Sequence, residues 1–323
     1  MAAVIGLVLI TVAVSMISGT SAHEVIPPVK PDGARLWYYW TWDSEQHTLI
    51  KQPYDSAAPS LFTDRNVAAR DRATKTHGSR AGQDKLVHSL IGTTYPNNAT
   101  SAAPFFVDLA ANHYRSFSNT YLLEKQHGWR GVCIEPNPSY TAGLVMHRRC
   151  QVVRNVITAS DGETVEFKMT NGHGGIVGSD FDNKNGGRSS VQIVGVNLNT
   201  LLDIFEAPKV IAYLSLDVEG AETYIIQNFN FKKHLFLIIT VERPGKKFHE
   251  IAVNNGYWWA NRLEITGEML YLHESTPNFH TYMAEHRGSR QHPPDHSWVQ
   301  STRGVPQPHE YLLTPSWPVT VAA

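Results

Sequence analysis

The chain has 323 residues, and its 28 lysines and arginines against 29 aspartates and glutamates give a net charge of −1. With 42% hydrophobic and 18% charged residues, it can bury a substantial core. The near-zero charge argues against nucleic-acid binding, which needs a dense basic face. Two cysteines exclude a disulfide-scaffold mini-protein and a cysteine-rich zinc module, and the 16 histidines are too scattered to predict a structural metal site.

Residues 2–22 carry no ionisable side chain. As a helix this segment would approach the thickness of the bilayer hydrocarbon, roughly 30 Å. Two interpretations are open: a signal peptide cleaved after the small residues 20–22, or a retained membrane anchor. A third interpretation is that these residues are a buried hydrophobic segment at the start of a soluble protein. Either of the first two places the body in the lumen of the secretory pathway or outside the cell.

Two further features bear on the compartment. Asn98-Ala99-Thr100 is a glycosylation sequon in a polar loop, which predicts a glycoprotein. Cys133 and Cys150 either pair in an oxidising lumen or remain two buried thiols.

Residues 23–81 show no sustained period of two or of 3.6, so we expect a linker and an irregular N-terminal extension. The aromatic run at 37–42 has two interpretations, a hydrophobic clasp that packs on the main domain or a platform on which a sugar stacks. We favour the clasp.

From residue 82 onward, short apolar runs alternate with longer amphipathic ones, which predicts βαβ units around a parallel sheet. We expect strands at 105–109, 131–135, 152–156, 211–218 and 236–242. Helices are expected at 85–91, 117–127, 138–149, 198–205, 222–229 and 246–255. We also expect a hairpin or meander over 164–196 and two edge strands within 256–273. The main domain thus spans 82–273. The tail, 274–323, is rich in proline and histidine and predicts a surface loop or a disordered segment without a metal role.

Ligands on such sheets bind at the carboxyl ends of the strands, where the strand order reverses. Asp108 ends the first strand and Glu135 ends the second. A carboxylate at the place of Glu135 accepts hydrogen bonds from a ribose diol in nucleotide-binding sheets. Asp161, after the third strand, is placed to receive an adenine amino group. The small Ala110 allows close backbone approach to a ligand.

Residues suited to helix starts follow two of these strands. Ser118 or Asn119 can cap the helix after the first strand, and Pro136 and Asn137 begin the helix after the second.

The fourth strand ends in three carboxylates, Asp217, Glu219 and Glu222, around a glycine at a strand-to-helix turn. Like-charge repulsion can raise the pKa of one of them, so that it removes or orients the proton of an acceptor hydroxyl. They could instead cap the helix or hold a divalent cation. We predict no metal site, because the helix direction turns Glu222 away from Asp217.

Several motifs occur in a specific order: Gly-Gln-Asp at 82–84, Phe-Val-Asp-Leu-Ala-Ala-Asn at 106–112, Ser-Asn-Thr at 118–120 with Leu123-Glu124, Gly-Trp-Arg-Gly-Val-Cys-Ile-Glu-Pro-Asn-Pro at 128–138, Tyr-Leu-Ser-Leu-Asp-Val-Glu-Gly-Ala-Glu at 213–222, and Val-Glu-Arg-Pro at 241–244. Together they resemble the FkbM-type methyltransferase family, over about residues 82–273. The resemblance implies an α/β, Rossmann-like class I methyltransferase fold, with a mostly parallel, doubly wound sheet and an antiparallel edge hairpin.

The resemblance also implies S-adenosylmethionine as cofactor and methyl transfer to a hydroxyl of a carbohydrate or small molecule. The catalytic residues would be Asp217, Glu219 and Glu222. The cofactor would bind Asp108, Ala110, Asn112, Ser118, Asn119, Glu135, Pro136, Asn137 and Asp161. The glycine-rich segment 172–187 would be a lid over the acceptor or a surface loop without function. We expect no nucleic-acid partner, and membrane attachment only through residues 2–22.

The chain departs from the family pattern at Ala110 and Tyr114, where glycines are usual. Ala110 fits if its φ is negative, and the Tyr114 ring would crowd the methionine end of the cofactor unless it turns outward. These departures favour an alternative function, a catalytically silent luminal interaction or trafficking module. An NAD-dependent oxidoreductase is a poorer alternative, because the Gly-rich pyrophosphate fingerprint is missing after the first strand.

Overall fold

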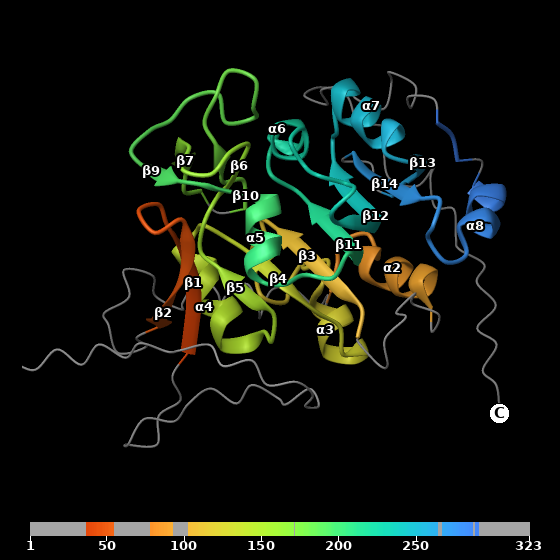
Figure 1. Cartoon of the computed structure of the whole chain (residues 1–323), viewed down its shortest axis with the longest axis horizontal. Coiled ribbons are helices and arrows are strands. Elements are labelled where there is room, and N and C mark those ends of the chain that lie inside the picture. Colours follow the sequence, from red (N-terminus) through yellow and green to blue (C-terminus); the bar gives the residue numbers. More distant parts are fainter. Residues whose placement is uncertain are drawn as a thin grey trace, which may run out of the picture. The chain divides into compact units, whose positions relative to one another are not determined.

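A sheet with nine strands runs through the part of the chain that the structure describes (Figure 1). The structure is a computed structural model, and it describes residues 37–54, 78–92, 103–170, 172–263, 267–286 and 288–290. In sheet order the strands are β13 (Tyr257–Arg262), β14 (Glu268–His273), β12 (Leu235–Glu242), β11 (Val210–Leu216), β3 (Phe105–Leu109), β4 (Arg130–Ile134), β5 (Gln151–Val153), β1 (Trp37–Asp43) and β2 (Thr48–Tyr54).

The five central strands are parallel, and their order reverses between β3 and β11. From β3 the chain moves outward to β4 and β5, and it then returns to β11 and moves outward to β12 on the other side. β14 and β13 add an antiparallel edge. This topology confirms the doubly wound sheet with an edge hairpin, and it places the ligand crevice at the carboxyl ends of β3 and β11.

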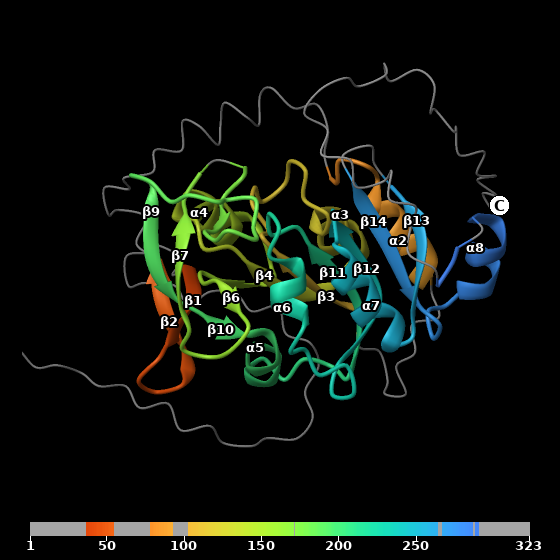
Figure 2. The ribbon, with the colours of Figure 1, turned by 90° about the horizontal axis from the view of Figure 1, so that it is seen from above.

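Helices cover both faces of the sheet (Figure 2). One face packs against α2 (Gln83–Ile91), α3 (Tyr121–His127), α4 (Pro138–His147) and α8 (Phe279–His286). The other packs against α5 (Leu198–Ile204), α6 (Glu222–Ile226) and α7 (Lys246–Asn254).

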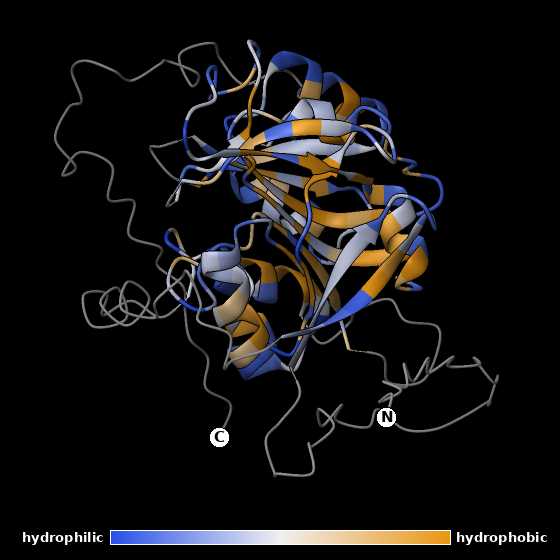
Figure 3. Ribbon diagram, turned by 90° about the vertical axis from the view of Figure 1, so that its left-hand side faces the viewer, coloured by the Kyte–Doolittle hydropathy of each residue, from blue (hydrophilic) through white to orange (hydrophobic). Residues whose placement is uncertain are grey.

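Two hydrophobic cores result, one on each side of the sheet. Alternate residues of one strand point to opposite cores: Phe106 belongs to the core under α2, α3 and α4, and Val107 to the core under α5, α6 and α7. Both faces of the central strands are buried, so these strands are continuous apolar runs. Figure 3 shows the apolar residues concentrated on the strands between the helices.

Two smaller sheets lie beside the large one. β7 (Thr164–Lys168) pairs antiparallel with β8 (Gly175–Ile176) and with β9 (Ser190–Val194). Of the hairpin or meander expected over 164–196, the hairpin is present as β7–β8, whereas the strand order β8-β7-β9 is not that of a meander. β6 (Ile157–Thr158) pairs in parallel with β10 (Val196–Asn197).

The irregular extension expected over 23–81 is wrong for residues 37–54, which form the hairpin β1–β2. β1 continues the main sheet beyond β5, with Trp40 opposite Val153 and the Arg154 N–H donating to the Trp40 carbonyl at 2.8 Å. Aromatic side chains occupy most successive positions of β1, so no period of two is visible in the sequence. Trp40 and Trp42 pack against the main core, which agrees with the favoured clasp.

The loop expected over 274–323 is wrong at its start, because α8 lies within it and buries Phe279 and Tyr282. Residues 291–323, the segment 2–22 and the sequon at Asn98 lie outside the described residues. Within the described ranges, no helix is both long enough and apolar enough to span a bilayer.

Candidate functional site

The loop that follows β3 has an unusual backbone. Ala110, Asn112 and Phe117 all have left-handed conformations, with φ of 59°, 51° and 62°. The negative φ under which Ala110 would fit the family pattern is therefore not met: this alanine has a positive φ, which glycine adopts without strain. The left-handed region costs an alanine about 1–2 kcal/mol, because its Cβ crowds the carbonyl oxygen.

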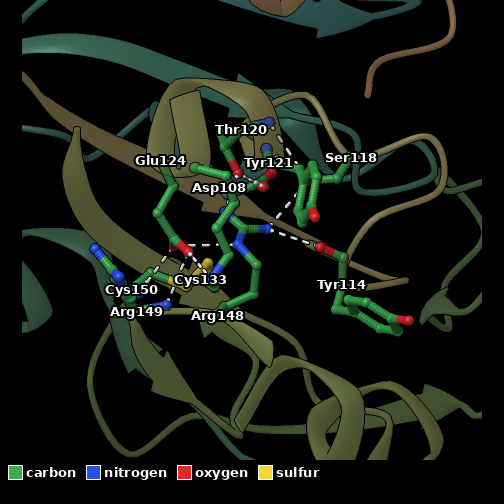
Figure 4. Close-up of polar contacts among 11 residues, drawn as sticks. Asp108, Tyr114, Ser118, Thr120, Tyr121, Glu124, Cys133, Arg148, Arg149 and Cys150 are labelled. Carbon is green, nitrogen blue, oxygen red and sulfur yellow. Dashed lines mark hydrogen bonds and ion pairs between the residues drawn. A yellow bond between two sulfur atoms is a disulfide. The ribbon is translucent and has the colours of Figure 1, made fainter. Parts of the chain in front are cut away.

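The Tyr114 ring lies against α4. It stacks on His147 at a centroid distance of 4.2 Å and on His113 at 4.6 Å, and a Cβ at Gly143 would lie 2.9 Å from its Cδ1. Figure 4 shows the ring pointing away from Asp108, with its backbone carbonyl directed to Arg148. The ring is thus buried in the core beside α4, and whether this leaves room for the methionine end of the cofactor stays a prediction.

Glu135 brings together three of the predicted cofactor residues. Its carboxylate is buried at the end of β4, where it accepts the Asn112 N–H at 2.8 Å and the Asn137 N–H at 2.7 Å. Burial raises the pKa of Glu135 to about 7, although both hydrogen bonds act in the opposite direction. Asn137 also caps α4, since its side chain accepts the Ser139 N–H. Pro136 lies between them and is buried.

Asp108 lies under the same loop, 3% exposed. Thr120 donates its hydroxyl hydrogen bond to Asp108 at 2.5 Å, and burial raises the pKa of the Asp108 carboxyl. This aspartate therefore anchors the loop from inside. A contact between Asp108 and the cofactor stays a prediction.

Ser118 and Asn119 connect the loop to neighbouring elements. The Ser118 hydroxyl accepts the Tyr121 N–H at the start of α3 at 3.1 Å. The N-cap residue is nevertheless Thr120, not Ser118 or Asn119 as predicted, and its side chain makes no capping hydrogen bond. The Asn119 amide donates to the Ser215 hydroxyl of β11 at 3.1 Å. The loop is thereby joined to the strand beside β3, across the point where the strand order reverses.

Asp161 has contacts that the sequence did not indicate. Its two carboxylate oxygens accept the Asn197 N–H and the Thr200 hydroxyl, each at 2.7 Å. These bonds hold the start of α5, so the structure gives Asp161 a structural role. Its contact with adenine stays a prediction.

Three carboxylates gather where β11 and β12 end. Asp217, Glu219 and Glu242 each place an oxygen within 4.8 Å of the others, a spacing that suits oxygen ligands of a divalent cation. The Asp217 side chain is exposed to solvent, but nearby protein atoms displace part of its hydration. This loss of hydration and the nearby Glu242 raise its pKa well above the ordinary value. Glu242 was not among the residues predicted for the site.

Glu222 does not belong to this group of three. It is the first residue of α6, and one oxygen accepts the Gly220 N–H at 3.1 Å and the Val218 N–H at 3.3 Å. Burial raises its pKa to about 8. Its side chain stabilises the turn after β11, a role close to the helix-capping alternative.

Sequence reasoning also missed Arg243, although the Val-Glu-Arg-Pro motif contains it. Its Nη2 contacts Glu219 at 3.2 Å, and it contacts Glu242 and Asp182 at 2.6 Å each. These carboxylates hold the pKa of Arg243 above its usual range. Arg243 thus neutralises part of the acidic group and ties it to the glycine-rich segment 172–187.

His173, also missed, lies in that segment between β7 and β8. Its Nδ1 is 3.2 Å from a carboxylate oxygen of Glu219, and its side chain is 86% exposed. The close approach depends on Gly175, because a Cβ there would lie 2.7 Å from Asn183 and 3.1 Å from the Glu219 Cβ. The segment therefore packs on the turn after β11. Whether it opens and closes as a lid stays a prediction.

The doubly wound sheet, with a buried glutamate ending β4 beside the loop after β3, is a Rossmann-like methyltransferase fold. Residues 108–286, more than half of the chain, match the family described as Methyltransferase FkbM domain. The chain belongs to this FkbM methyltransferase family, which confirms the resemblance seen in the motifs and indicates methyl transfer as the class of activity. No curated protein matches the chain.

Proposed function

We propose that the protein is an S-adenosylmethionine-dependent O-methyltransferase that acts on a hydroxyl of a carbohydrate or small molecule. The observation that carries the proposal is the position of Glu135, a buried carboxylate at the end of β4 that faces the backbone of Asn112. A ribose diol needs such an acceptor at this edge of the sheet.

The residues around Glu135 fit that cofactor. Each carboxylate oxygen accepts one backbone N–H, and each has a second lone pair that can accept a ribose hydroxyl. Asn112 and Asn137 hold the carboxylate in place from both sides. S-adenosylmethionine supplies a methyl group on a positively charged sulfur, which an oxygen nucleophile can attack.

The acceptor hydroxyl must lose its proton, and His173 with Glu219 is suited to receive it. Glu219 orients the imidazole through Nδ1, and Nε2 of His173 has no protein partner among the described residues. Arg243 fixes the second oxygen of Glu219. A base whose imidazole is oriented by a carboxylate recurs in proton-transfer sites. Asp217 lies beside this pair and contacts the acceptor.

The proposed setting is the lumen of the secretory pathway or the cell exterior, with a leader at residues 2–22. The uncharged leader supports this setting. So does the disulfide between Cys133 and Cys150, because structural disulfides persist in oxidising compartments.

A silent interaction module is the second candidate. The observation that favours it is Ala110, which bears a Cβ where the family pattern has glycine and where the backbone is left-handed. Such a module would keep the fold and the Glu135 contacts but would not bind the cofactor.

Calorimetric titration of the full chain with S-adenosylmethionine separates the two candidates. We expect saturable binding by the wild type, strong loss in Glu135→Ala, and unchanged binding in the control Glu250→Gln, an exposed carboxylate on α7. A methyl-transfer assay against a glycan panel, which detects the demethylated cofactor, then tests the activity. Absence of binding at high micromolar concentration refutes the enzyme and leaves the module.

A further inference from the structure

Arg148, just after α4, is the most completely buried charge near the loop that follows β3 (Figure 4), with a side chain 0% exposed. Its Nε donates to Glu124 of α3 at 3.1 Å. Its two terminal nitrogens donate into the loop: Nη1 to the Ser118 hydroxyl at 3.1 Å and the Tyr114 carbonyl at 3.4 Å, and Nη2 to the Thr120 hydroxyl at 2.9 Å. One guanidinium therefore holds three points of the segment 114–120.

This segment needs an external support. Phe117 within the segment, and Ala110 and Asn112 just before it, have left-handed backbones, which cost free energy in residues with a Cβ. Phe117 is also 55% exposed, so its side chain contributes little packing. The bonds from Arg148 supply part of the missing stabilisation. They extend to β3, because Thr120 in turn donates to Asp108.

Arg148 is itself held by the segment that follows it. The Glu124 carboxylate accepts the backbone N–H of Arg149 at 2.8 Å and of Cys150 at 3.0 Å, in addition to the Arg148 side chain. Cys150 is bonded to Cys133 in the middle of β4. A buried arginine keeps its position only while its partners stay fixed, since an unpaired buried charge is unfavourable.

The contacts form a closed circuit around the carboxyl end of β3. From Asp108 the circuit passes through Thr120 to Arg148, and along the chain to Cys150. The disulfide then leads to Cys133, which is the register partner of Asp108 on the neighbouring strand. Breaking the disulfide opens this circuit next to Arg148.

We propose that Arg148 is a positioning residue for the cofactor loop at 110–120 and that the Cys133–Cys150 disulfide holds Arg148 in place, so that the loop is fully ordered and cofactor affinity is full only in the oxidised chain. The effect on affinity rests on the proposed function, whereas the order of the loop does not. Reducing the disulfide gives residues 148–150, just before β5, more conformational freedom. Because Arg148 then holds its position less firmly, its hydrogen bonds to the loop weaken.

The test measures two quantities on the full chain: hydrogen exchange of the amides at 114–120, and affinity for S-adenosylmethionine. The variant is Arg148→Lys, which keeps the charge beside Glu124 but lacks the planar fork that reaches Ser118 and Thr120 together. Arg290→Lys, on a distant exposed arginine, is the matched control. The redox arm uses dithiothreitol: the dithiol gives two electrons and two protons, the S–S bond becomes two thiols, and the reagent becomes its cyclic disulfide.

We expect the amides at 114–120 to exchange at least tenfold faster in Arg148→Lys and in the reduced wild type, with β11 and β12 unchanged. The Kd for S-adenosylmethionine rises at least tenfold, and KM for the cofactor rises while kcat at saturation stays within threefold. If Arg148→Lys does not fold, Ser118→Ala removes the hydroxyl that Arg148 contacts and leaves the Arg148–Glu124 pair intact. Because the same hydroxyl accepts the N–H groups of Thr120 and Tyr121, loop exchange in that variant is read at 114–117.

Unchanged loop exchange in Arg148→Lys, or in Ser118→Ala where that variant replaces it, overturns the positioning role. Equal loop exchange in the oxidised and the reduced protein, with thiol titration confirming reduction, overturns the redox dependence. A wild type that binds no S-adenosylmethionine refutes the proposed function alone, since loop exchange still decides the role of Arg148.

Discussion

Replacing Glu135 by glutamine should make cofactor binding independent of the protonation of this site. Burial raises the pKa of the Glu135 carboxyl to about 7, against 4.5 for an ordinary glutamate. The ribose diol donates its hydrogen bonds, so it binds the ionised carboxylate better than the protonated one. The affinity of the wild type should therefore increase as the pH rises through 7.

The size of the effect follows from that pKa. Glu135 is about 3% ionised at pH 5.5 and about 90% ionised at pH 8, so Kd should be about 30-fold higher at the lower pH. Glutamine lacks the charge, and losing a charge-assisted hydrogen bond costs about 1.5–3 kcal/mol, or about 10- to 150-fold in affinity at pH 8.

Stability should have the opposite pH dependence. The folded state binds the Glu135 proton more tightly than the unfolded state, so the free energy of unfolding decreases as the pH rises from 4.5 to about 7. A shift of this size corresponds to about 3 kcal/mol, which Glu135→Gln should not lose. Cofactor binding and stability thus respond to one proton in opposite directions.

Calorimetric titrations from pH 5.5 to 8 measure both Kd and the number of protons exchanged. The amino group of the cofactor titrates equally with both proteins, so the ratio of their Kd values isolates Glu135. A wild-type to Glu135→Gln ratio that does not change with pH would refute the reasoning, and it would mean that the cofactor does not contact this carboxylate.

Three other predictions concern single residues. Ala110→Gly should stabilise the fold by about 0.5–1 kcal/mol, because glycine adopts the left-handed backbone without strain; a lower melting temperature would contradict this. Glu222→Gln keeps an oxygen that can accept the two backbone N–H groups but removes the ionisable carboxyl. Because the pKa of that carboxyl is about 8 in the folded protein, the wild type becomes less stable as the pH rises from 4.5 to 8. Urea unfolding at several pH values should therefore give a flatter profile for this variant than for the wild type. His173→Gln should reduce kcat by about 10²- to 10⁴-fold with unchanged cofactor affinity. Added imidazole should restore part of the lost activity of His173→Ala. Near-normal turnover of either variant would exclude His173 as the base.

The central strands could be predicted because they are buried on both faces. The bounds predicted for β3 match the structure. Its five residues are apolar except Asp108, the fourth of them. The hairpin β1–β2 could not be recognised. Its aromatic residues follow one another along β1, so the local pattern contains no alternation that would indicate a strand.

The candidate site was predictable only where its residues follow strands directly. Glu135 and Asp217 each come at or just after the end of an apolar run, so topology alone places them at the ligand edge. Arg243 and His173 were missed because their partners come from distant parts of the chain, such as Asp182 in the glycine-rich segment. Local sequence contains no signal for such contacts.

The hairpin β1–β2 also determines how short a self-sufficient fragment can be. A fragment that begins between the hairpin and α2 would keep the central strands but lack β1, and the backbone groups of β5 that face β1 would be unpaired. Unpaired edges of this kind recruit strands from other molecules. Recombinant fragments that begin after the hairpin should therefore self-associate, whereas those that include residue 37 keep β5 paired with β1.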